Sequence, residues 1–257
     1  MKYASLREGL QLAICPSVSG GGGIVPDLSG RGNHGVLTNM DASGYASWHR
    51  GNSLRTDGVN DYVSVAGAPV SFADRFSIAF WVNITSGRML LTKGNMGTFG
   101  DRGYGFDFGG FVAGHIEFLA IESNLAYINR SAANPGGWVH VCGMFNSSIA
   151  GTDRLMLFLN GVQQTGIVTS VGTVSAVATN NANLLIGSFS SLSLFAAAQF
   201  DDVRAYSRVL TPSEIQLLAS EPGIGLRPER TSVFFGAQLF QAAWLAQGRN
   251  IIGGGVC

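Results

Sequence analysis

Short apolar runs recur along most of the chain, and turn-forming residues separate them. The runs are rich in β-branched and aromatic residues, and clusters of Gly, Asn, Asp or Pro lie between them. Examples are "YVSVAG", "FSIAFWVNI", "YGFDFGG", "HIEFLAI", "WVHVCGMFN" and "NLLIGSF". Phe76, Ile78 and Phe80 alternate with Ser77 and Ala79, so the two sets lie on opposite faces of a strand. Many short, half-buried strands predict an all-β sandwich or jelly roll.

Two local signals predict a hairpin and a helix. The Asn-Gly pair at 160–161 follows the run "LMLFL", and this dipeptide favours a type I′ hairpin turn. In "LTPSEIQLLAS", Thr211 can cap a helix, Pro212 suits the first helical position and Glu214 completes a capping box. We therefore expect one short helix near the C-terminal end, and a core that extends over about residues 54–218.

Length and charge restrict the class of protein. With 257 residues, the chain can form one large all-β domain or two small ones. The formal net charge is +0 and the arginines are scattered singly, which argues against a nucleic-acid partner. No run approaches the ~20 apolar residues of a membrane span. Charged residues make up 12% of the chain, against about 25% in an average soluble protein. Large buried contacts with other chains would account for that shortage.

The N-terminus and the cysteines indicate a soluble protein without a disulfide framework. In "MKYASLREGLQLAIC", Arg7 and Glu8 precede a short, interrupted apolar part, which does not match a signal peptide. The three cysteines are an odd number and form no CxxC motif. We therefore expect free thiols at Cys15, Cys142 and Cys257.

Eight blocks in order resemble one known family. They are "DLSGRGNHGVL", "LRTDGVNDYVSV", "FSIAFWVN", "LLTKGN", "WVHVCGMFN", "LMLFLNGVQQ", "NNANLLIGSF" and "FDDVRAYSRVLTPSEIQLL". Over about residues 27–220 the chain is similar to the laminin-G-like branch of the concanavalin A-like lectin/glucanase superfamily. The resemblance implies a two-sheet antiparallel jelly roll with one short C-terminal helix, usually a binding module. Residues 1–26 would form an N-terminal arm with the first strand, and 221–257 a C-terminal arm.

The opening of the chain carries a second, less specific resemblance. The stretch "REGLQLAICPSVSGGGGIVPDLSGRGNHGVLTNMD" is similar to the N-termini of laminin-G-like structural proteins of bacteriophages and prophages. This resemblance implies a virion component.

The stretch "DLSGRGNHG" allows two interpretations. A phosphate loop is excluded, because no Lys-Ser/Thr and no helix follow the glycines. Asp27 and Asn33 offer oxygen ligands that suit calcium. In relatives with this motif a structural calcium ion ties the N-terminal loop to the last strand, which adds Asp201 or Asp202 as candidates. Alternatively, Asp27 caps a turn, His34 packs against the sheet, and glycines supply positive φ at Gly30, Gly32 and Gly35.

Catalytic signatures are absent from the sequence. Glycosidases of this fold carry acids at alternate positions of one strand, and no E-x-D-x-E pattern occurs. Glu117 and Glu122 are five residues apart, so a regular strand would place them on opposite faces, and no acid pair is expected to share a face. His140 alternates with Val139 and Val141, which favours a half-buried sheet histidine over a general base. We therefore expect no enzymatic activity.

Two further groups of residues point to ligands or partners. Tyr45, Trp48 and Tyr104 lie near turn signals, where aromatic residues can contact a glycan or pack between loops. The C-terminal arm, residues 221–257, is a candidate docking tail, because it carries large apolar residues that exceed the needs of a sandwich complete by Leu218. They either fold back over an outer sheet face or dock on a neighbouring subunit, and they are Phe234, Phe235, Leu239, Phe240, Trp244 and Leu245.

Together these features favour a non-enzymatic structural or binding module of a multi-subunit particle. A phage virion surface component fits best, either a capsid decoration protein or a tail or fibre protein, located in the virion. Its partners would be other virion proteins or copies of itself, bound through the tail. The alternative is a soluble carbohydrate-binding lectin module.

Overall fold

The computed structural model describes residues 3–19, 22–40, 44–48, 51–94, 103–123, 126–189 and 192–226. These residues belong to one compact unit, Met1–Arg227. The second unit, Pro228–Cys257, lies outside the described residues, and so do the six tail residues predicted to dock and Cys257.

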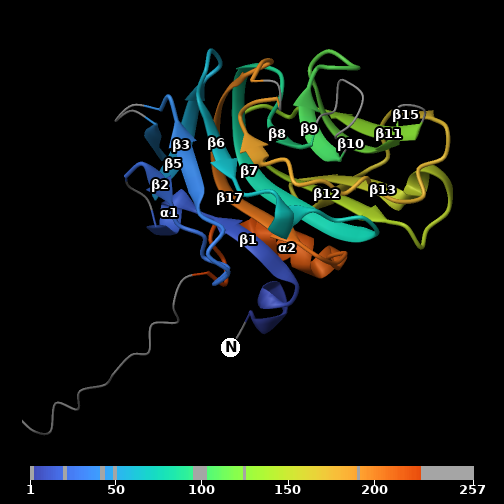
Figure 1. The fold of residues 1–257 in the computed structure, drawn as a ribbon, viewed down its shortest axis with the longest axis horizontal. Helices are drawn as coiled ribbons and strands as arrows, with labels where there is room; N and C mark the ends of the chain where they lie inside the picture. Colours follow the sequence, from blue (N-terminus) through green and yellow to red (C-terminus); the bar gives the residue numbers. More distant parts are fainter. Residues whose placement is uncertain are drawn as a thin grey trace, which may run out of the picture. The chain divides into compact units, whose positions relative to one another are not determined.

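The described chain forms two antiparallel sheets, which confirms the predicted all-β sandwich (Figure 1). The eight-stranded sheet has the order β14-β13-β12-β7-β17-β5-β4, and β1 also pairs with β17. Its strands are β1 (Leu10–Ile14), β4 (Tyr45–Trp48), β5 (Gly51–Asp57), β7 (Arg75–Gly87), β12 (Trp138–Asn146), β13 (Leu155–Leu159), β14 (Val162–Gln164) and β17 (Ala196–Tyr206).

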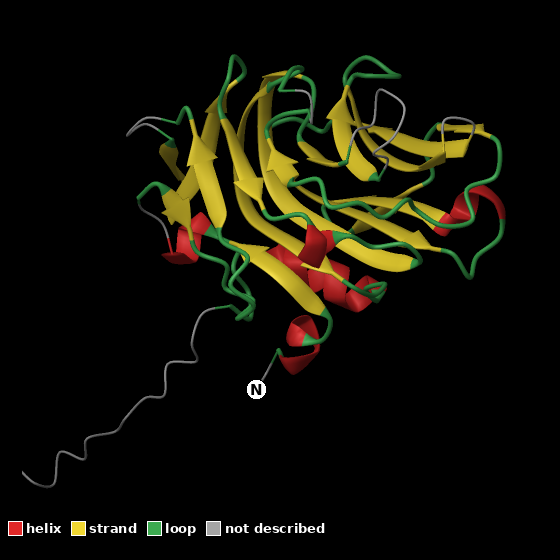
Figure 2. Cartoon of the chain, viewed as in Figure 1, coloured by secondary structure: helices red, strands yellow, loops and turns green. Residues whose placement is uncertain are grey.

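The nine-stranded sheet has the order β15-β11-β10-β9-β8-β16-β6-β3-β2. Its strands are β2 (Ile24–Val25), β3 (Gly35–Thr38), β6 (Tyr62–Val65), β8 (Leu91–Lys93), β9 (Tyr104–Phe108), β10 (His115–Ser123), β11 (Ala126–Ala133), β15 (Val168–Val171) and β16 (Leu184–Ile186). Strands dominate the fold, and helical segments are short (Figure 2). These segments are η1 (Ala4–Arg7), α1 (Pro16–Ser19), η2 (Ala68–Val70), η3 (Gly151–Arg154) and α2 (Pro212–Ser220).

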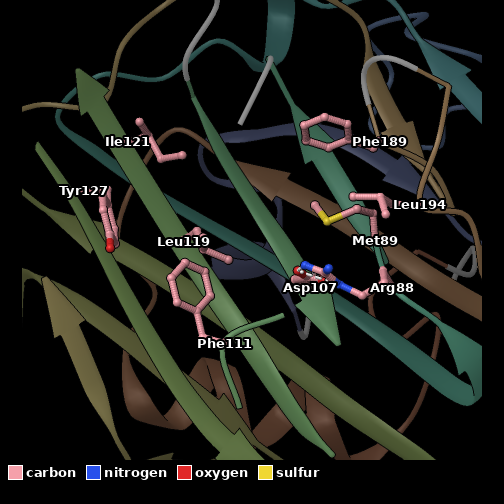
Figure 3. Close-up of a pocket in the computed structure, with 9 residues that line it drawn as sticks. All are labelled: Arg88, Met89, Asp107, Phe111, Leu119, Ile121, Tyr127, Phe189 and Leu194. Carbon is pink, nitrogen blue, oxygen red and sulfur yellow. Dashed lines mark hydrogen bonds and ion pairs between the residues drawn. The ribbon is translucent and has the colours of Figure 1, made fainter. Parts of the chain in front are cut away.

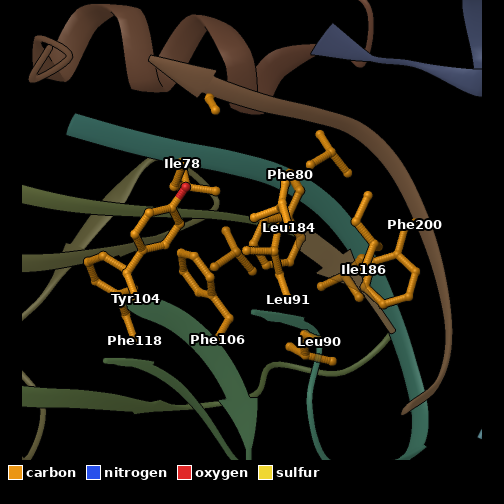
Figure 4. Close-up of a cluster of buried hydrophobic side chains, with 14 of the residues drawn as sticks. Ile78, Phe80, Leu90, Leu91, Tyr104, Phe106, Phe118, Leu184, Ile186 and Phe200 are labelled. Carbon is orange, nitrogen blue, oxygen red and sulfur yellow. The ribbon is translucent and has the colours of Figure 1, made fainter. Parts of the chain in front are cut away.

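The main core lies between the two sheets and follows from strand alternation (Figure 4). On β7, Phe80 points inward and meets Phe106 of β9 edge to face, with ring centroids 4.9 Å apart. Phe106 in turn stacks on Phe118 of β10 at 4.6 Å. Each of these rings is fully buried. The apolar half of each alternating run therefore holds the sheets together, and the other half is left for the outer faces.

The predicted helix and hairpin are both confirmed. Thr211 caps α2, and its hydroxyl accepts from the Glu214 backbone N–H while the Glu214 carboxylate accepts from the Thr211 backbone N–H. Asn160 and Gly161 have φ of 49° and 80°, as a type I′ turn between β13 and β14 requires. Ile215 of α2 is buried in a second apolar cluster on the outer face of the eight-stranded sheet.

The buried region is longer than the expected residues 54–218. It begins earlier, because β1 pairs with β17 and places Leu12 and Ile14 in the main core. It also continues past Ser220, because Ile224 and Leu226 are buried in the second cluster. Residues 221–226 are therefore packed against the domain and do not belong to a free tail.

Candidate functional site

The outer face of the nine-stranded sheet carries the candidate site. On β10, Ile116, Phe118 and Ala120 point into the core, so alternation turns the side chains of Glu117, Leu119 and Ile121 to the outside. Strand register then adds neighbours on the same face. Asp107 of β9 lies opposite Glu117, and Tyr127 of β11 lies opposite Ile121.

A hollow of about 280 Å³ lies on this face (Figure 3). One wall comes from β10, β11 and the turn after β9, and the other comes from the link between β7 and β8 and the segment after β16, with Asp107 of β9 between them. The lining residues are Arg88, Met89, Asp107, Phe111, Leu119, Ile121, Tyr127, Phe189 and Leu194. Apolar side chains thus form most of the hollow, and Arg88 and Asp107 contribute its charged groups.

Aromatic side chains give the hollow a surface for a flat ligand. Phe111 is 47% exposed, and its ring lies 6.0 Å from the ring of Tyr127 at an angle of 44°. Phe189 lies on the opposite wall (Figure 3). Exposed aromatic rings bury a large area when a ligand covers them, and their faces attract C–H groups and cations. The hollow can therefore hold a ring-shaped or partly apolar group.

A buried carboxylate fixes the position of Phe111. The Glu117 carboxylate accepts from the backbone N–H of Phe111 at 2.8 Å and of Val112 at 2.7 Å. Burial raises the pKa of Glu117, and the nearby charge of Asp107 adds to this effect, while the two N–H donors oppose it. Glu117 is thus a positioning residue for the turn that presents the aromatic ring.

Arg88 and Asp107 form an ion pair beside this turn. The Arg88 Nε donates to both Asp107 oxygens at 3.1 and 3.2 Å, and its Nη2 also binds Asp107. The hydrogen bond to Asp107 raises the pKa of Arg88, which therefore stays charged. The Arg88 side chain is 40% exposed, whereas that of Asp107 is 5% exposed. A ligand in the hollow would therefore meet mainly the cation of this pair.

The structure corrects the expectation that no acids share a face. Asp107 and Glu117 do share one, because they lie opposite each other on neighbouring strands, a relation that a pattern within one strand does not reveal. Both residues are buried, at 3% and 0% exposure. Their oxygens bind Arg88 and two backbone N–H groups. Glu122 instead accepts from the Ser175 backbone N–H and hydroxyl. This arrangement does not place two carboxylates on either side of a substrate bond.

The segment after β16 separates the first hollow from a second one on the same face. Leu192 and Leu194 have φ of 54° and 53°, a left-handed backbone that costs free energy for a residue with a β-carbon. The Met89 N–H donates to the Leu194 carbonyl at 2.9 Å and holds the segment. The second hollow also has about 280 Å³ and is lined by Tyr62, Ser64, Ala182, Asn183, Leu185 and Leu192.

The three aromatic residues predicted as possible glycan contacts do not line the first hollow. Tyr104 is 1% exposed, and its hydroxyl donates to the Val70 carbonyl at 2.8 Å, so burial removes it from the candidate glycan contacts. Tyr45 is half-buried and packs against the main core, and its hydroxyl donates to the Gly22 carbonyl. Trp48 ends β4, and its side chain lies outside the described residues.

The stretch around Asp27 is a tight turn held by that carboxylate. Oδ1 accepts from the backbone N–H groups of Ala13 and Ser29 at 2.9 Å, and Oδ2 accepts from the Ser29 hydroxyl at 2.7 Å and the Asn33 N–H at 2.9 Å. Gly30 has φ of 87°, as expected for a glycine turn.

Other residues of this stretch behave differently from the expectation. Gly35 lies in β3 without positive φ, and a β-carbon there would meet Val63 at 2.7 Å and Ile14 at 2.9 Å, so close packing requires the glycine. His34 is exposed and does not pack on the sheet; its Nδ1 accepts from the Asp27 N–H.

The candidate calcium ligands do not form a shared site. Four protein donors already occupy Asp27, and the side-chain amide of Asn33 donates to the Gln11 carbonyl. In the described ranges, no three His, Cys, Asp or Glu side chains are placed to hold one metal ion. Calcium needs six to eight oxygen ligands that are free of competing donors. In this arrangement the residues do not fit a shared ion.

Asp201 and Asp202 have structural partners at a bulge in β17. The bulge shifts the register against β7 between Asp201 and Arg204, and Asp202 has φ of 50°. Asp202 forms a buried ion pair with Arg204, with 2.7 Å between Oδ1 and Nε, and accepts from the Gly223 N–H. Asp201 accepts from the Ser17 N–H, and burial raises its pKa to about 6.

His140 and the described cysteines are inert core groups. His140 is 1% exposed, deeper than the half-buried position expected, and burial lowers its pKa to about 3. It packs edge to face against Trp81 at 5.6 Å. Cys15 and Cys142 are free and buried, and burial raises the pKa of both thiols. These groups are not available as a base or a nucleophile.

The residues that line the hollow were not selected from the sequence. Phe111 lies in "GGFVAG", where a large aromatic residue between glycines is a usable signal for an exposed turn. Tyr127 and Arg88 carry no such signal, because only tertiary structure brings Tyr127 of β11 and Arg88 of the β7–β8 link to the same hollow as Phe111. In the part of the chain that the structure describes, no helix is long and apolar enough to cross a membrane.

Solved structures with a similar fold include binding domains of clostridial toxins. The binding domain of Paraclostridial Mosquitocidal Protein 1 matches with a TM-score of 0.61 and 16% identity, covering 83% of this chain and 52% of that one. The ligand-binding domain of botulinum neurotoxin serotype D in complex with N-acetylneuraminic acid has a TM-score of 0.63, 13% identity, and covers 84% and 52%. The chain spans about half the length of these structures.

A third similar structure was determined with a protein ligand. The binding domain of botulinum neurotoxin DC in complex with rat synaptotagmin II has a TM-score of 0.59 and 13% identity, covering 86% of this chain and 52% of that one. At such identities the likeness shows the fold alone. No curated protein sequence matches this chain significantly.

A family model agrees with the architecture. The laminin G model described as "Concanavalin A-like lectin/glucanases superfamily" matches residues 57–216, more than half of the chain. These residues include the strands that form the first hollow and the capped helix α2 up to Gln216. The chain therefore belongs to the concanavalin A-like lectin/glucanase superfamily.

Proposed function

We propose that this chain is a non-catalytic carbohydrate-binding module and that the first hollow is its ligand site. The observation that carries the proposal is the pairing of two aromatic rings, exposed Phe111 and half-buried Tyr127, with one accessible cation. Phe111 and Tyr127 offer faces on which the C–H side of a sugar ring can stack. Arg88 can donate to a sugar hydroxyl or carboxylate while it keeps its pair with Asp107.

The similar structures support this proposal at the level of the fold. One is a ligand-binding domain in complex with N-acetylneuraminic acid, a sugar acid. Another belongs to botulinum neurotoxin type C, whose cell entry depends on interaction with two ganglioside molecules. An acidic sugar would suit the cation at Arg88, so sialylated glycans are the first ligands to test.

A glycan array followed by calorimetry on each hit tests the proposal. We expect Phe111→Ala and Tyr127→Ala to weaken binding about fivefold each, since one stacked ring contributes on the order of 1 kcal/mol. Val59→Ala is the matched control, because Val59 is 69% exposed and lines neither hollow. Absence of glycan binding, or equal binding by all variants, would contradict the proposal.

The absence of catalysis has its own test. Asp107 and Glu117 are buried and hydrogen-bonded to the protein, so neither can reach a glycosidic bond. We expect no reducing sugar to be released from laminarin, lichenan or agar. Turnover that Glu117→Gln abolishes, while the variant still folds, would show that the module is an enzyme.

A second candidate function is attachment to a multi-subunit particle such as a phage virion. The observation that favours it is the shortage of charge together with an apolar terminal segment beyond a domain that closes near Leu226. In this proposal the module displays its hollow, and residues 228–257 bind a neighbouring subunit. Calcium is not part of either proposal.

Truncation tests the attachment. A chain that ends at Arg227 keeps the buried turn 221–226 and should fold, yet it should fail to co-sediment with particles. Phe240→Asp with Trp244→Asp should act similarly, because burying a carboxylate in an apolar groove is costly. Normal incorporation of either variant would show that the tail is not the attachment.

A further inference from the structure

One stretch of the chain contains no charged residue. Residues 155–200 include no Asp, Glu, Lys, Arg or His, between Arg154 and Asp201. The stretch forms β13, β14, β15, β16 and the first part of β17. It also supplies most of the large apolar side chains that the described residues expose, namely Val162, Ile167, Val171, Leu192 and Leu194. An exposed surface without charge is typical of one that another protein covers.

Strand β15 is the edge of the nine-stranded sheet and lies within this stretch. In the described residues it pairs with β11 alone, with Tyr127 opposite Val171 and Asn129 opposite Thr169. The Ser131 N–H donates to the Ile167 carbonyl at 2.9 Å. In an antiparallel pair the backbone groups alternate in direction, so those of the residues at 168 and 170 point away from β11.

Apart from its short length, this edge lacks the features that keep sheet edges apart. Protein edges are usually protected by shortness, Lys, Pro, a bulge or an inward-pointing charge. The four residues of β15 read "VTSV", with no charge and no proline, and their register with β11 has no shift. The outward N–H and C=O groups of Val168 and Ser170 are therefore a template for another strand.

We propose that β15 pairs antiparallel with β15 of a second copy, in a register centred on Thr169. In this register Val168 lies opposite the partner's Ser170, and Ser170 lies opposite the partner's Val168. Every outward backbone group of the two residues then has a partner, which gives four hydrogen bonds across a twofold axis.

The chemistry of the edge favours a second copy over a charged partner. A charged strand would find no opposite charge within residues 155–200, whereas a second copy is equally neutral. The pairing would also join two outer faces into one. Val171 lies beside Tyr127, whose ring adjoins Phe111. The first hollow of each copy would therefore face the same side of a continuous sheet. This inference does not depend on what the hollow binds.

Cysteine cross-linking tests both the pairing and its register. In a Cys257→Ser background, Thr169→Cys would face its own copy across a non-hydrogen-bonded pair with Cα atoms about 4.5 Å apart. That distance lies within the range of disulfides, about 4.4–6.8 Å. Val171→Cys is the matched control on the same strand and face. Its copy would lie about 13 Å away along the strand, too far for a bond.

We expect mild oxidation to give about tenfold more dimer with Thr169→Cys than with Val171→Cys. The native thiols of Cys15 and Cys142 are buried and do not compete. Adding Ser170→Pro should abolish the cross-link, because it removes an outward N–H that β11 does not use. Circular dichroism establishes that this variant keeps its fold.

Sedimentation velocity on the full chain under reducing conditions gives an independent result. The wild type should show a dimer that Ser170→Pro converts to monomer and that Val162→Lys leaves intact, since Val162 lies on β14 at the edge of the other sheet. Equal cross-linking at both positions, a monomer at every concentration, or a dimer lost only in Val162→Lys would overturn the proposal.

Discussion

The outer faces of the two sheets differ in what covers them. On the eight-stranded sheet, α2, the N-terminal segment and the turn 221–226 bury a second apolar cluster. On the nine-stranded sheet, two hollows and several apolar side chains are exposed. Figure 1 shows α2 and β1 beside β17 and β7, which belong to the first sheet. The outer face of the eight-stranded sheet is therefore buried within the domain, whereas the outer face of the nine-stranded sheet is accessible to ligands or partners.

Charged side chains on the covered face join distant segments of the chain, and of these Arg204 and Asp202 are buried while Arg7 is exposed. Arg204 binds Asp202 and donates to the Ile224 carbonyl at 2.8 Å. Arg7 donates to the Gly225 carbonyl at 3.1 Å and to the Leu28 carbonyl at 2.9 Å. These bonds join segments that are far apart in the sequence. The same type of substitution should therefore lower stability when it is made on the covered face of the eight-stranded sheet. On the open face of the nine-stranded sheet it should instead weaken ligand binding.

The largest expected effect is on the buried ion pair. Arg204→Met leaves Asp202 as an uncompensated buried charge, which should lower the free energy of unfolding by about 3–5 kcal/mol. Urea unfolding followed by tryptophan fluorescence measures it. Asp153→Asn is the control, because its pair with Arg130 involves an Asp153 side chain that is 85% exposed. A loss below about 1 kcal/mol for Arg204→Met would show that the covered face is not held by this pair.

Next comes the direct comparison of one phenylalanine from each face. Phe158 is 4% exposed in the second cluster, and Phe158→Ala should cost about 3 kcal/mol of unfolding free energy. Phe111 is 47% exposed, and Phe111→Ala should cost less than about 1 kcal/mol while it weakens ligand binding. Thermal unfolding of both variants measures the two losses of unfolding free energy. Equal losses would mean that the open face is also part of the stable core.

A smaller effect depends on pH at Asp201. Burial raises its pKa to about 6 from 3.8, so between these values the folded protein binds more protons than the unfolded chain. Unfolding free energy from this group therefore falls as pH rises from about 4 to 6. Asp201→Asn should match the wild type near pH 4 and exceed it by on the order of 2 kcal/mol above pH 6.

Denaturant unfolding from pH 4 to 7 measures the difference between the two proteins. Asp57→Asn is the control on an exposed turn, since backbone N–H donors lower the pKa of Asp57, so its contribution would have the opposite sign. A difference that stays constant with pH would show that Asp201 does not titrate in this range.

The smallest expected effect is that of metal removal. Because protein donors occupy Asp27, and Arg204 pairs with Asp202, EDTA should leave the melting temperature unchanged. A calcium ion at a hundredfold excess over its Kd would stabilise the fold by about 2.7 kcal/mol. A clear fall with EDTA, reversed by calcium, would restore the calcium hypothesis for the turn.

Sequence alone determined the class of the fold and its local elements. Alternation in β7, the Asn160-Gly161 hairpin and the capping box at Thr211 depend on neighbouring residues, so each could be identified from a short window. The turn at Asp27 was anticipated as one of two alternatives for the same reason. To predict these features, it is enough to know the period of a strand, the φ that a glycine can adopt or the reach of a capping side chain.

Tertiary structure decided which residues meet across strands, and with them the candidate site. Asp107 and Glu117 became neighbours through register, and so did Ile121 and Tyr127. Tyr104 was a candidate glycan contact because of its nearby turns, with packing as the alternative, and its contact with η2 shows that it is buried. Sequence period tells which side chains of one strand share a face, but it does not tell which strands lie side by side. The order of the strands is set by long-range pairing, because the free energy of burying apolar area between two whole sheets outweighs the local preferences of each strand.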